Sequence, residues 1–360
     1  MVARKSDAWF GGAFGWGLTA IIVNAYRELM FVYELGDEIM VFGFSRGAFA
    51  VRSLVGLIRT CGILGRDSLR FVPDAVDRYR SMEPDCHPNA DDCHAFRLRH
   101  APRITTSDKE RAWRIKNGHD VGDVIPLKIA FMGVWDTVIA MGFPEILPIV
   151  KVFNVQYRFH DAQLTSMVEA ARHGISIDER RRLYLGYPWA NMQELTQKYD
   201  RRLRPTHLQQ WFPGNHGSVG GGGSITGLSS IALNWIALGA REAGLEIDFA
   251  ALDIHADDYD VTAPLVNKPS MAKAGLAGGV LRFLRWDRSG PDTLEDVSMS
   301  AIDRCFEVRD YVDTPTLHKV GDLVQSMDEE QRANMRKARQ WVDGALTHKP
   351  VQKTRPKNPD

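Results

Sequence analysis

The residues with the clearest chemical potential form the pentapeptide Gly43-Phe44-Ser45-Arg46-Gly47. It follows a run of β-forming apolar residues, 39 to 42, which is typical of a buried strand. From Ala48 onward, apolar residues recur at helical spacing. Gly-x-Ser-x-Gly between a strand and a helix is the pattern of a nucleophile elbow, a sharp turn that exposes a serine hydroxyl. We therefore expect Ser45 to be a nucleophile, with an ordinary glycine-rich turn as the alternative.

The rest of the pentapeptide fits this interpretation. An elbow is so tight that the positions two before and two after the serine have little room for side chains, so we expect Gly43 and Gly47 to be needed there. The N-terminus of the following helix points its N–H groups toward developing negative charge. The Arg46 backbone N–H is therefore the expected oxyanion donor.

A serine hydroxyl needs a histidine to accept its proton and a carboxylate to hold that histidine. In α/β-hydrolases these partners follow the serine in the order acid, then histidine. Asp136 lies at the end of a second predicted buried strand, 127 to 134, which ends at Trp135-Asp136-Thr137, and His216 lies in a glycine-rich loop after the strand candidate 208 to 212. We expect these two residues to complete a triad. The alternatives are a helix N-cap for Asp136 and an exposed loop residue for His216.

Glycines surround this histidine. Gly220, Gly221 and Gly222 allow unusual dihedral angles and close backbone approach, so we expect them to shape the loop. The glycine run is not followed by Gly-Lys-Ser/Thr, the feature of a phosphate-binding loop.

Four blocks, in order, resemble the DUF2235 family, which includes the catalytic domain of Tle1-type type VI secretion lipase effectors. The blocks are Gly36-Asp37-Glu38-Ile39 with Gly43 to Ala48, Phe131-Met132-Gly133-Val134-Trp135-Asp136-Thr137, His173 to Arg181, and Trp211-Phe212-Pro213-Gly214-Asn215-His216 with Val219 to Gly222. The resemblance covers roughly residues 10 to 245. It implies an α/β-hydrolase fold, with a mostly parallel sheet flanked by helices, and a phospholipase A or related carboxylic-ester hydrolase.

The same resemblance carries the nucleophile to Ser45 and the base to His216. It leaves two candidates for the acid, Asp136 and Asp178, and the strand-end position favours Asp136. If Asp136 is the acid, we expect Asp178 to pair with an arginine and fix the loop that bears His216. The implied substrate is a phospholipid or another lipid ester, reached by transient contact with a membrane surface. A secretion apparatus or an immunity protein as partner, and delivery to a target cell or periplasm, rest on family analogy alone.

Two differences between this sequence and the family pattern favour an alternative function. No strand ending in Asp-Gly-Thr precedes the elbow, and only 38 residues precede the elbow strand, so we expect an N-terminally truncated sheet that lacks the second oxyanion loop. Ser218 stands where relatives usually have aspartate, and Gly223 where an aromatic residue is common. The alternative is therefore a catalytically weak or inactive hydrolase-like binding module. Hydrolysis of a non-lipid ester or amide is also open, because a triad does not choose the acyl group.

Composition sets broader bounds. The 360 residues have 44% hydrophobic content and zero formal net charge, which gives no field to recruit nucleic acid. No apolar run is long enough for a transmembrane helix, and four cysteines indicate a reducing compartment, so we expect synthesis in the cytoplasm. The cysteine and histidine pairs at 86 to 87 and 93 to 94 match no standard zinc spacing, so we expect no metal and no cofactor.

The pattern along the chain predicts a hydrolase-like domain at 1–260 with an insertion at about 66–123, an irregular helical extension at 261–346, and a disordered tail at 347–360. Helices are expected at 18–33, 161–173 and 229–243. The apolar segments 138–155 and 262–286 are candidates for a lid and for lipid contact. The basic runs at 180–182 and 201–204 either meet phospholipid headgroups or form a solvated face.

Overall fold

The computed structural model describes residues 13–138, 163–181, 184–192, 194–195, 206–248, 250, 258–265, 287–309, 311, 315–325 and 327–343. Most of the predicted lid (138–155) and of the segment 262–286 lies outside these residues. The basic run 201–204 and the predicted tail 347–360 also lie outside them.

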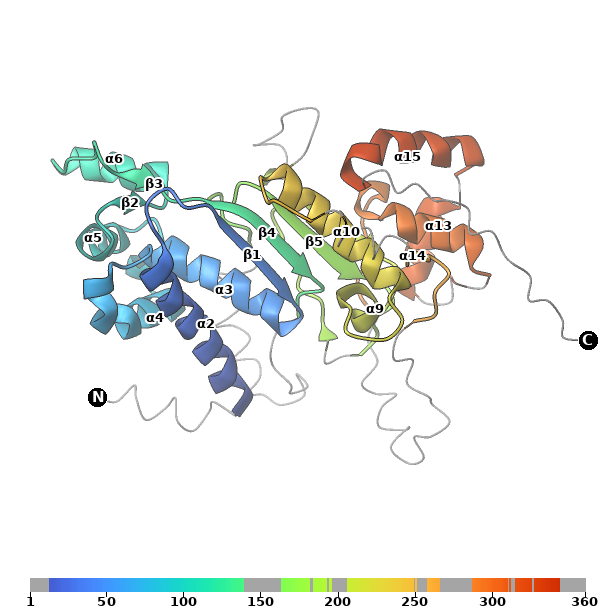
Figure 1. The fold of residues 1–360 in the computed structure, drawn as a ribbon, viewed down its shortest axis with the longest axis horizontal. Helices are drawn as coiled ribbons and strands as arrows, with labels where there is room; N and C mark the ends of the chain where they lie inside the picture. The colour runs from blue at the N-terminus through green and yellow to red at the C-terminus, as the bar shows by residue number, and fades with distance from the viewer. Residues whose placement is uncertain are drawn as a thin grey trace, which may run out of the picture.

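Within the described residues, four parallel strands form the main sheet, in the order β1-β4-β5-β6 (Figure 1). The strands are β1 (Ile39–Phe44), β4 (Ile129–Trp135), β5 (Ala171–Ser176) and β6 (His207–Phe212). The strands expected at 39–42, 127–134 and 208–212 are confirmed. Since the carboxyl ends of parallel strands meet at one edge of a sheet, the residues that follow β1, β4 and β6 lie near one another.

Strand β5 corrects the sequence-based expectation of a helix at 161–173. The described residues before it form turns, and the strand itself is buried at every position. Two polar residues obscured it. Arg172 donates to the Trp235 carbonyl at 2.5 Å and pairs with Glu242 at 3.1 Å, and His173 contacts Gln209 at 3.0 Å. Because tertiary partners satisfy these groups, a polar stretch occupies the centre of the sheet.

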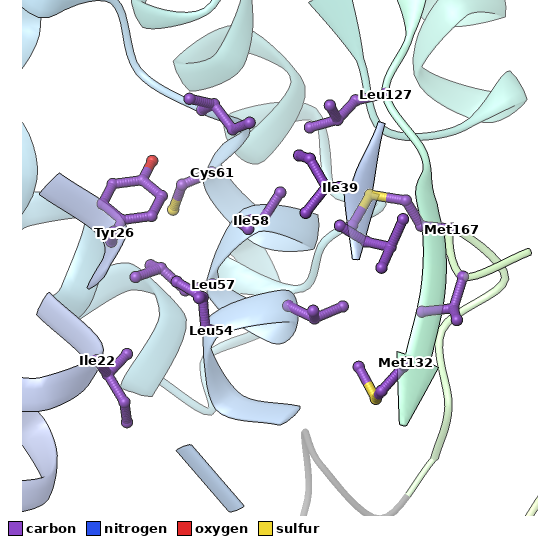
Figure 2. Close-up of a cluster of buried hydrophobic side chains, with 14 of the residues drawn as sticks. Ile22, Tyr26, Ile39, Leu54, Leu57, Ile58, Cys61, Leu127, Met132 and Met167 are labelled. Atoms are coloured by element: carbon purple, nitrogen blue, oxygen red, sulfur yellow. The ribbon is translucent and has the colours of Figure 1, made fainter. Parts of the chain in front are cut away.

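One face of the sheet is covered by helices α2 (Ala13–Val32) and α3 (Arg46–Cys61). Figure 2 shows side chains of both helices meeting those of the strands, with Leu57 and Ile58 between Tyr26 and Ile39. Tyr26 is fully buried and its hydroxyl donates to the Gly62 carbonyl at 2.7 Å. This contact fixes α2 on the end of α3, the helix that follows Ser45.

The opposite face carries α10 (Gly227–Glu242), which confirms the helix expected at 229–243 and begins two residues earlier. Its Trp235 and Ile236 are buried with Phe131 and Phe212 of the sheet. From Phe131 onward, alternate residues of β4 face different cores, since Phe131 and Trp135 pack with α10 while Met132 and Val134 belong to the α3 side.

The predicted insertion is folded. It contains α4 (Val72–Arg80), α5 (Asp91–His100), α6 (Asp108–Lys116), the short helices Arg66–Phe71 and Pro84–Cys86, and a two-stranded sheet of β2 (Ile104–Thr105) and β3 (Ile125–Pro126). The fully buried Glu110 bridges Arg97 at 2.7 Å and Arg114 at 2.6 Å. Charged residues that look like solvated surface in the sequence thus hold this part of the chain together.

The later part of the chain packs at the β6 edge through the helices α13 (Met299–Glu307), α14 (Pro315–Val324) and α15 (Glu329–Asp343), preceded by the short helix Leu294–Asp296. The Ser298 N–H donates to the Trp211 carbonyl of β6 at 3.0 Å.

Among the described residues, no single helix is long and apolar enough to cross a bilayer. Only the pair Arg46–Cys61 and Arg66–Arg80 reaches that length and apolar character when the two helices are taken together, and they are bent by 107° relative to each other.

Candidate active site

Ser45 lies between β1 and α3 in a strained backbone conformation, with φ 61° and ψ −123°. Its N–H donates to the Trp135 carbonyl at the end of β4, at 3.0 Å. A positive φ in a residue other than glycine costs on the order of 1–3 kcal/mol and is concentrated at functional sites. The turn directs Oγ to the carboxyl edge of the sheet, where it lies 2.7 Å from His216 Nε2.

The two glycines of the pentapeptide differ in what they provide. A β-carbon at Gly43 would lie 2.5 Å from the Gly47 carbonyl oxygen and 2.7 Å from Ala48, so this position has no room for a side chain. At Gly47, apart from its chain neighbours and the backbone of its own helix, no atom lies within 4 Å of where a β-carbon would stand. The expectation that both positions must be free of side chains is therefore wrong for Gly47, which faces open space in the first turn of α3.

His216 begins the short helix α9 (His216–Gly220), which is capped by Asn215 through its side-chain oxygen. The backbone N–H of His216 donates to Glu179 Oε2 at 3.1 Å. Its ring contacts those of Phe44 and Tyr184, with centroids 4.5 and 4.6 Å away. The imidazole therefore has a fixed position and orientation.

The other ring nitrogen of His216, Nδ1, lies 2.6 Å from Asp136 Oδ2. Asp136 follows β4, is completely buried and has a φ of 38°. Its second oxygen accepts from the Ser176 N–H at 2.9 Å. Arg288 donates to both carboxylate oxygens, at 2.5 and 3.0 Å. Burial alone would raise the pKa of Asp136, but the Arg288 charge and the hydrogen bonds from His216 and Arg288 outweigh it and hold that pKa below its usual value.

Asp178, the other candidate acid, does not contact His216 Nδ1. Its Oδ2 accepts from the Gly214 N–H at 2.6 Å and from the Tyr311 hydroxyl at 2.8 Å. Burial, together with the nearby Asp178 charge, raises the pKa of Tyr311 well above its usual value, so the hydroxyl remains a donor. Asp178 thus braces the loop that leads to His216, as anticipated if Asp136 is the acid, and it does so together with Tyr311.

The glycines after His216 differ in their environment. A β-carbon at Gly220 would lie 2.0 Å from the Phe44 ring, whereas Gly221 and Gly222 adopt φ values of 82° and 90°. Ser218, which replaces the aspartate usual in relatives, donates through its N–H and hydroxyl to Asn215 Oδ1 at 3.1 and 3.0 Å. The loop is therefore braced from within by Asn215 and from β5 by Asp178.

Four residues of this site were missed by the sequence analysis as contributors: Phe44, Glu179, Tyr184 and Arg288. Phe44 and Glu179 lie inside the recognised blocks, so their positions were visible although their contacts were not. Arg288 lies far along the chain from the other residues, in a stretch with no distinguishing pattern. Only the folded structure brings it to Asp136.

The remaining predicted features do not converge on the site as free binding groups. Arg180 pairs with Asp287 at 2.7 Å, and Arg181 pairs with Glu179 at 2.7 Å. Within the residues that the structure describes, no three His, Cys, Asp or Glu side chains are grouped as metal ligands. Cys93, from the cysteine and histidine pairs, contacts Arg78 at 3.8 Å.

Comparison with known proteins gives one family and one curated relative. Residues 1–238 match the family described as "T6SS, Phospholipase effector Tle1-like, catalytic domain". The chain is 32% identical over 168 residues to the "Uncharacterized protein YEL023C" of Saccharomyces cerevisiae. This match includes 47% of the chain and 21% of the yeast protein, so the chain spans about a fifth of that relative's length. No solved structure matches the chain.

Proposed function

The chain belongs to the family of Tle1-like catalytic domains of type VI secretion phospholipase effectors, and from this premise we propose that it is a serine-dependent hydrolase of lipid carboxylic esters, of the phospholipase A type. The observation that carries the proposal is the series of two hydrogen bonds from Ser45 to His216 at 2.7 Å and from His216 to Asp136 at 2.6 Å. The position of Ser45 between a parallel strand and a helix supports assignment of the α/β-hydrolase fold.

In the proposed reaction, the Ser45 hydroxyl attacks the acyl carbonyl of the lipid while His216 Nε2 takes up its proton. Asp136 accepts a hydrogen bond from the N–H at Nδ1 of His216 and so holds the tautomer in which Nε2 is the base. His216 then returns the proton to the alcohol leaving group, which leaves the acyl group on Ser45. Attack by water, again with His216 as base, releases the fatty acid.

Negative charge develops on the carbonyl oxygen during both steps. Arg46 is the first residue of α3, so its N–H has no intrahelical acceptor and stands at the positive end of the helix dipole. This N–H is the proposed oxyanion donor. A missing donor costs about 10²–10³ in rate, so the rate depends strongly on whether a second donor is present.

The test is release of fatty acid from phosphatidylethanolamine vesicles by the purified protein. We expect release by the wild type and by Ser224→Ala, a control at an exposed serine outside the hydrogen-bonded series. Ser45→Ala should abolish it, and a fluorophosphonate should label the wild type but not Ser45→Ala. Identification of the lysophospholipid formed would assign the regiospecificity.

A folded wild type that neither releases fatty acid nor reacts with the fluorophosphonate would contradict the proposal and favour a hydrolase-like binding module. Labelling without lipid hydrolysis would instead point to a non-lipid acyl substrate. Delivery to a target cell, with a secretion or immunity partner, is proposed from family membership alone.

A further inference from the structure

Arg288 connects four separate segments at the carboxyl edge of the sheet. Its guanidinium donates to Asp136 after β4, to the Ser176 carbonyl at 3.0 Å at the end of β5, and to the Tyr184 carbonyl at 2.6 Å. Its own carbonyl accepts from the Thr316 hydroxyl of α14 at 2.7 Å. The side chain is buried, and it lies outside residues 1–238. This arginine therefore links several segments of the fold and, in addition, contacts the acid of the proposed triad directly.

We propose that Arg288 is a positioning residue of this site, which fixes the rotamer of Asp136 and limits how strongly the Asp136 carboxylate accepts the hydrogen bond from His216. The inference rests on the proposed function for its kinetic consequences. Its geometric part concerns the Asp136 to His216 contact alone and does not depend on turnover.

The geometric argument starts from the hydrogen-bond capacity of one carboxylate, which offers about four acceptor sites. In Asp136, Oδ1 accepts from the Ser176 N–H and from Arg288 Nη1, and Oδ2 accepts from Arg288 Nη2 and His216 Nδ1. The planar fork of an arginine grips both oxygens at once, which a lysine ammonium does not do. Arg288 thereby fixes the carboxylate plane and leaves one direction of Oδ2 for His216.

The electrostatic argument concerns how strongly Asp136 stabilises a protonated imidazole. A carboxylate whose pKa is held low by an adjacent guanidinium is a weaker proton acceptor, so it stabilises the imidazolium less. The other charged or titratable groups around the pair are Glu179 and Arg181 after β5, His173 on β5, Arg52 of α3 and Tyr184. Glu179 and Arg181 form an ion pair with each other. Among the described residues, Arg288 is therefore the positively charged side chain in direct contact with Asp136.

The experiment compares the rate of fluorophosphonate labelling at Ser45 as a function of pH in the wild type, Arg288→Gln and Arg288→Lys. The matched control is Arg304→Gln, which removes another buried arginine of the same C-terminal part. Arg304 donates to the Val261 and Ala263 carbonyls and lies over the Tyr311 ring, 4.8 Å from its centroid, and among the described residues it makes no direct contact with Ser45, His216 or Asp136. All measurements are made below the unfolding temperature of each variant.

For Arg288→Gln we expect the plateau rate to fall by about 10²-fold, the typical effect of a misplaced catalytic group. The acid limb of its profile should also move up by about one pH unit, because Asp136 becomes a stronger acceptor. Arg288→Lys should lose a similar part of the plateau rate but keep the acid limb of the wild type, since it retains the charge. An acid limb that stays in place in Arg288→Gln, with a rate loss equal to that of Arg304→Gln, would reduce Arg288 to a structural role and overturn the inference.

A second measurement separates this inference from the proposed function. For the proton on His216 Nδ1, held in the 2.6 Å contact with Asp136, we expect a far-downfield proton NMR signal in the wild type. We expect Arg288→Gln to shift or abolish this signal and Arg304→Gln to retain it. If the wild type fails to label at Ser45, the proposed function fails, and this NMR comparison still decides the inference. An unchanged signal in Arg288→Gln would overturn it.

Discussion

The Phe44 ring fills the space beside Gly220, so closely that a β-carbon on Gly220 would lie 2.0 Å from it. The same ring contacts the His216 ring at a centroid distance of 4.5 Å, with the two planes tilted by 33°. The residue before the proposed nucleophile thus contacts both the proposed base and the end of the short helix that carries the base. A change in the packing of the elbow should therefore also change the packing of the loop that carries His216.

We therefore expect Gly220→Ala to displace the Phe44 ring and, through it, His216. The change should lower lipid hydrolysis and reduce the free energy of unfolding by about 1–3 kcal/mol, as overpacking of a core does. The double variant Phe44→Leu with Gly220→Ala should recover part of both losses, because the smaller side chain leaves room for the new methyl group. Additive losses in this double-mutant cycle would contradict the contact.

The two glycines of the pentapeptide should respond differently to alanine. Gly43→Ala would force the new methyl group against the Gly47 carbonyl oxygen, so we expect a misaligned Ser45 and a loss of about 10²-fold in labelling rate. Gly47→Ala meets open space in a helix and should keep the activity while stabilising the protein by up to about 1 kcal/mol. Labelling rates and thermal unfolding of the pair decide the matter. Equal damage at both positions would be inconsistent with the geometry of the elbow.

The two aspartates should separate catalysis from stability. Asp136→Asn removes the charge behind His216 and disturbs its tautomer, so we expect kcat to fall by about 10⁴, as in serine hydrolase triads generally. Asp178→Ala leaves the Gly214 N–H and the Tyr311 hydroxyl without this acceptor and should cost about 1–3 kcal/mol for each group left unsatisfied. Urea unfolding and initial rates, measured side by side, distinguish the two effects. A loss of activity at Asp178 as large as that at Asp136 would reverse the assignment of the acid.

His173 should make stability depend on pH. Burial, assisted by the Arg52 charge, lowers the pKa of His173 to about 3, whereas an exposed histidine in the unfolded chain titrates near about 6.5. Between these values the unfolded chain binds a proton that the folded protein does not. The contribution is therefore fully present above pH of about 6.5 and is lost as the pH falls, by at most about 1.4 kcal/mol per pH unit for one proton.

The measurement for His173 is urea unfolding at several pH values between 7 and 5 in the wild type and in His173→Gln. We expect the variant to have a shallower dependence, because glutamine does not titrate. His94, whose pKa burial lowers to about 4, contributes in the same direction and is present in both proteins. Identical slopes in the two proteins would show that His173 does not carry the effect.

The sequence predicted those elements whose patterns are set by burial of apolar residues. Strands β1 and β4 and helix α10 have continuous or periodic apolar residues, and each was located within a few positions. Strand β5 was mistaken for helix because Arg172 and His173 satisfy their polar groups through partners on α10 and β6, which no local pattern records. The polar composition of β5 is explained by its tertiary contacts.

The same distinction applies to the candidate site. Ser45 and His216 were identifiable because the elbow and the glycine-rich loop constrain the local backbone strongly. The choice between the two aspartates was left open because each matches an aspartate of the family, although the strand-end position favoured Asp136. The fold shows that Asp136 lies behind His216. Arg288 carries no local mark, because its role comes from where α13 and α14 dock on the sheet. Whether these residues catalyse hydrolysis stays a prediction that the labelling experiment tests.

The hydrogen bond between Ser45 and His216 joins residues 171 positions apart, and that between Asp136 and Arg288 joins residues 152 positions apart. Contacts of such long sequence separation require the closure of large loops, which slows their formation relative to local structure. During synthesis, β1 and α3 leave the ribosome long before the loop that bears His216. On the proposed function, the Ser45 hydroxyl is therefore at first an ordinary unreactive alcohol, and the cell that makes the protein meets an activated nucleophile only after the segment that bears His216 has been made and folded.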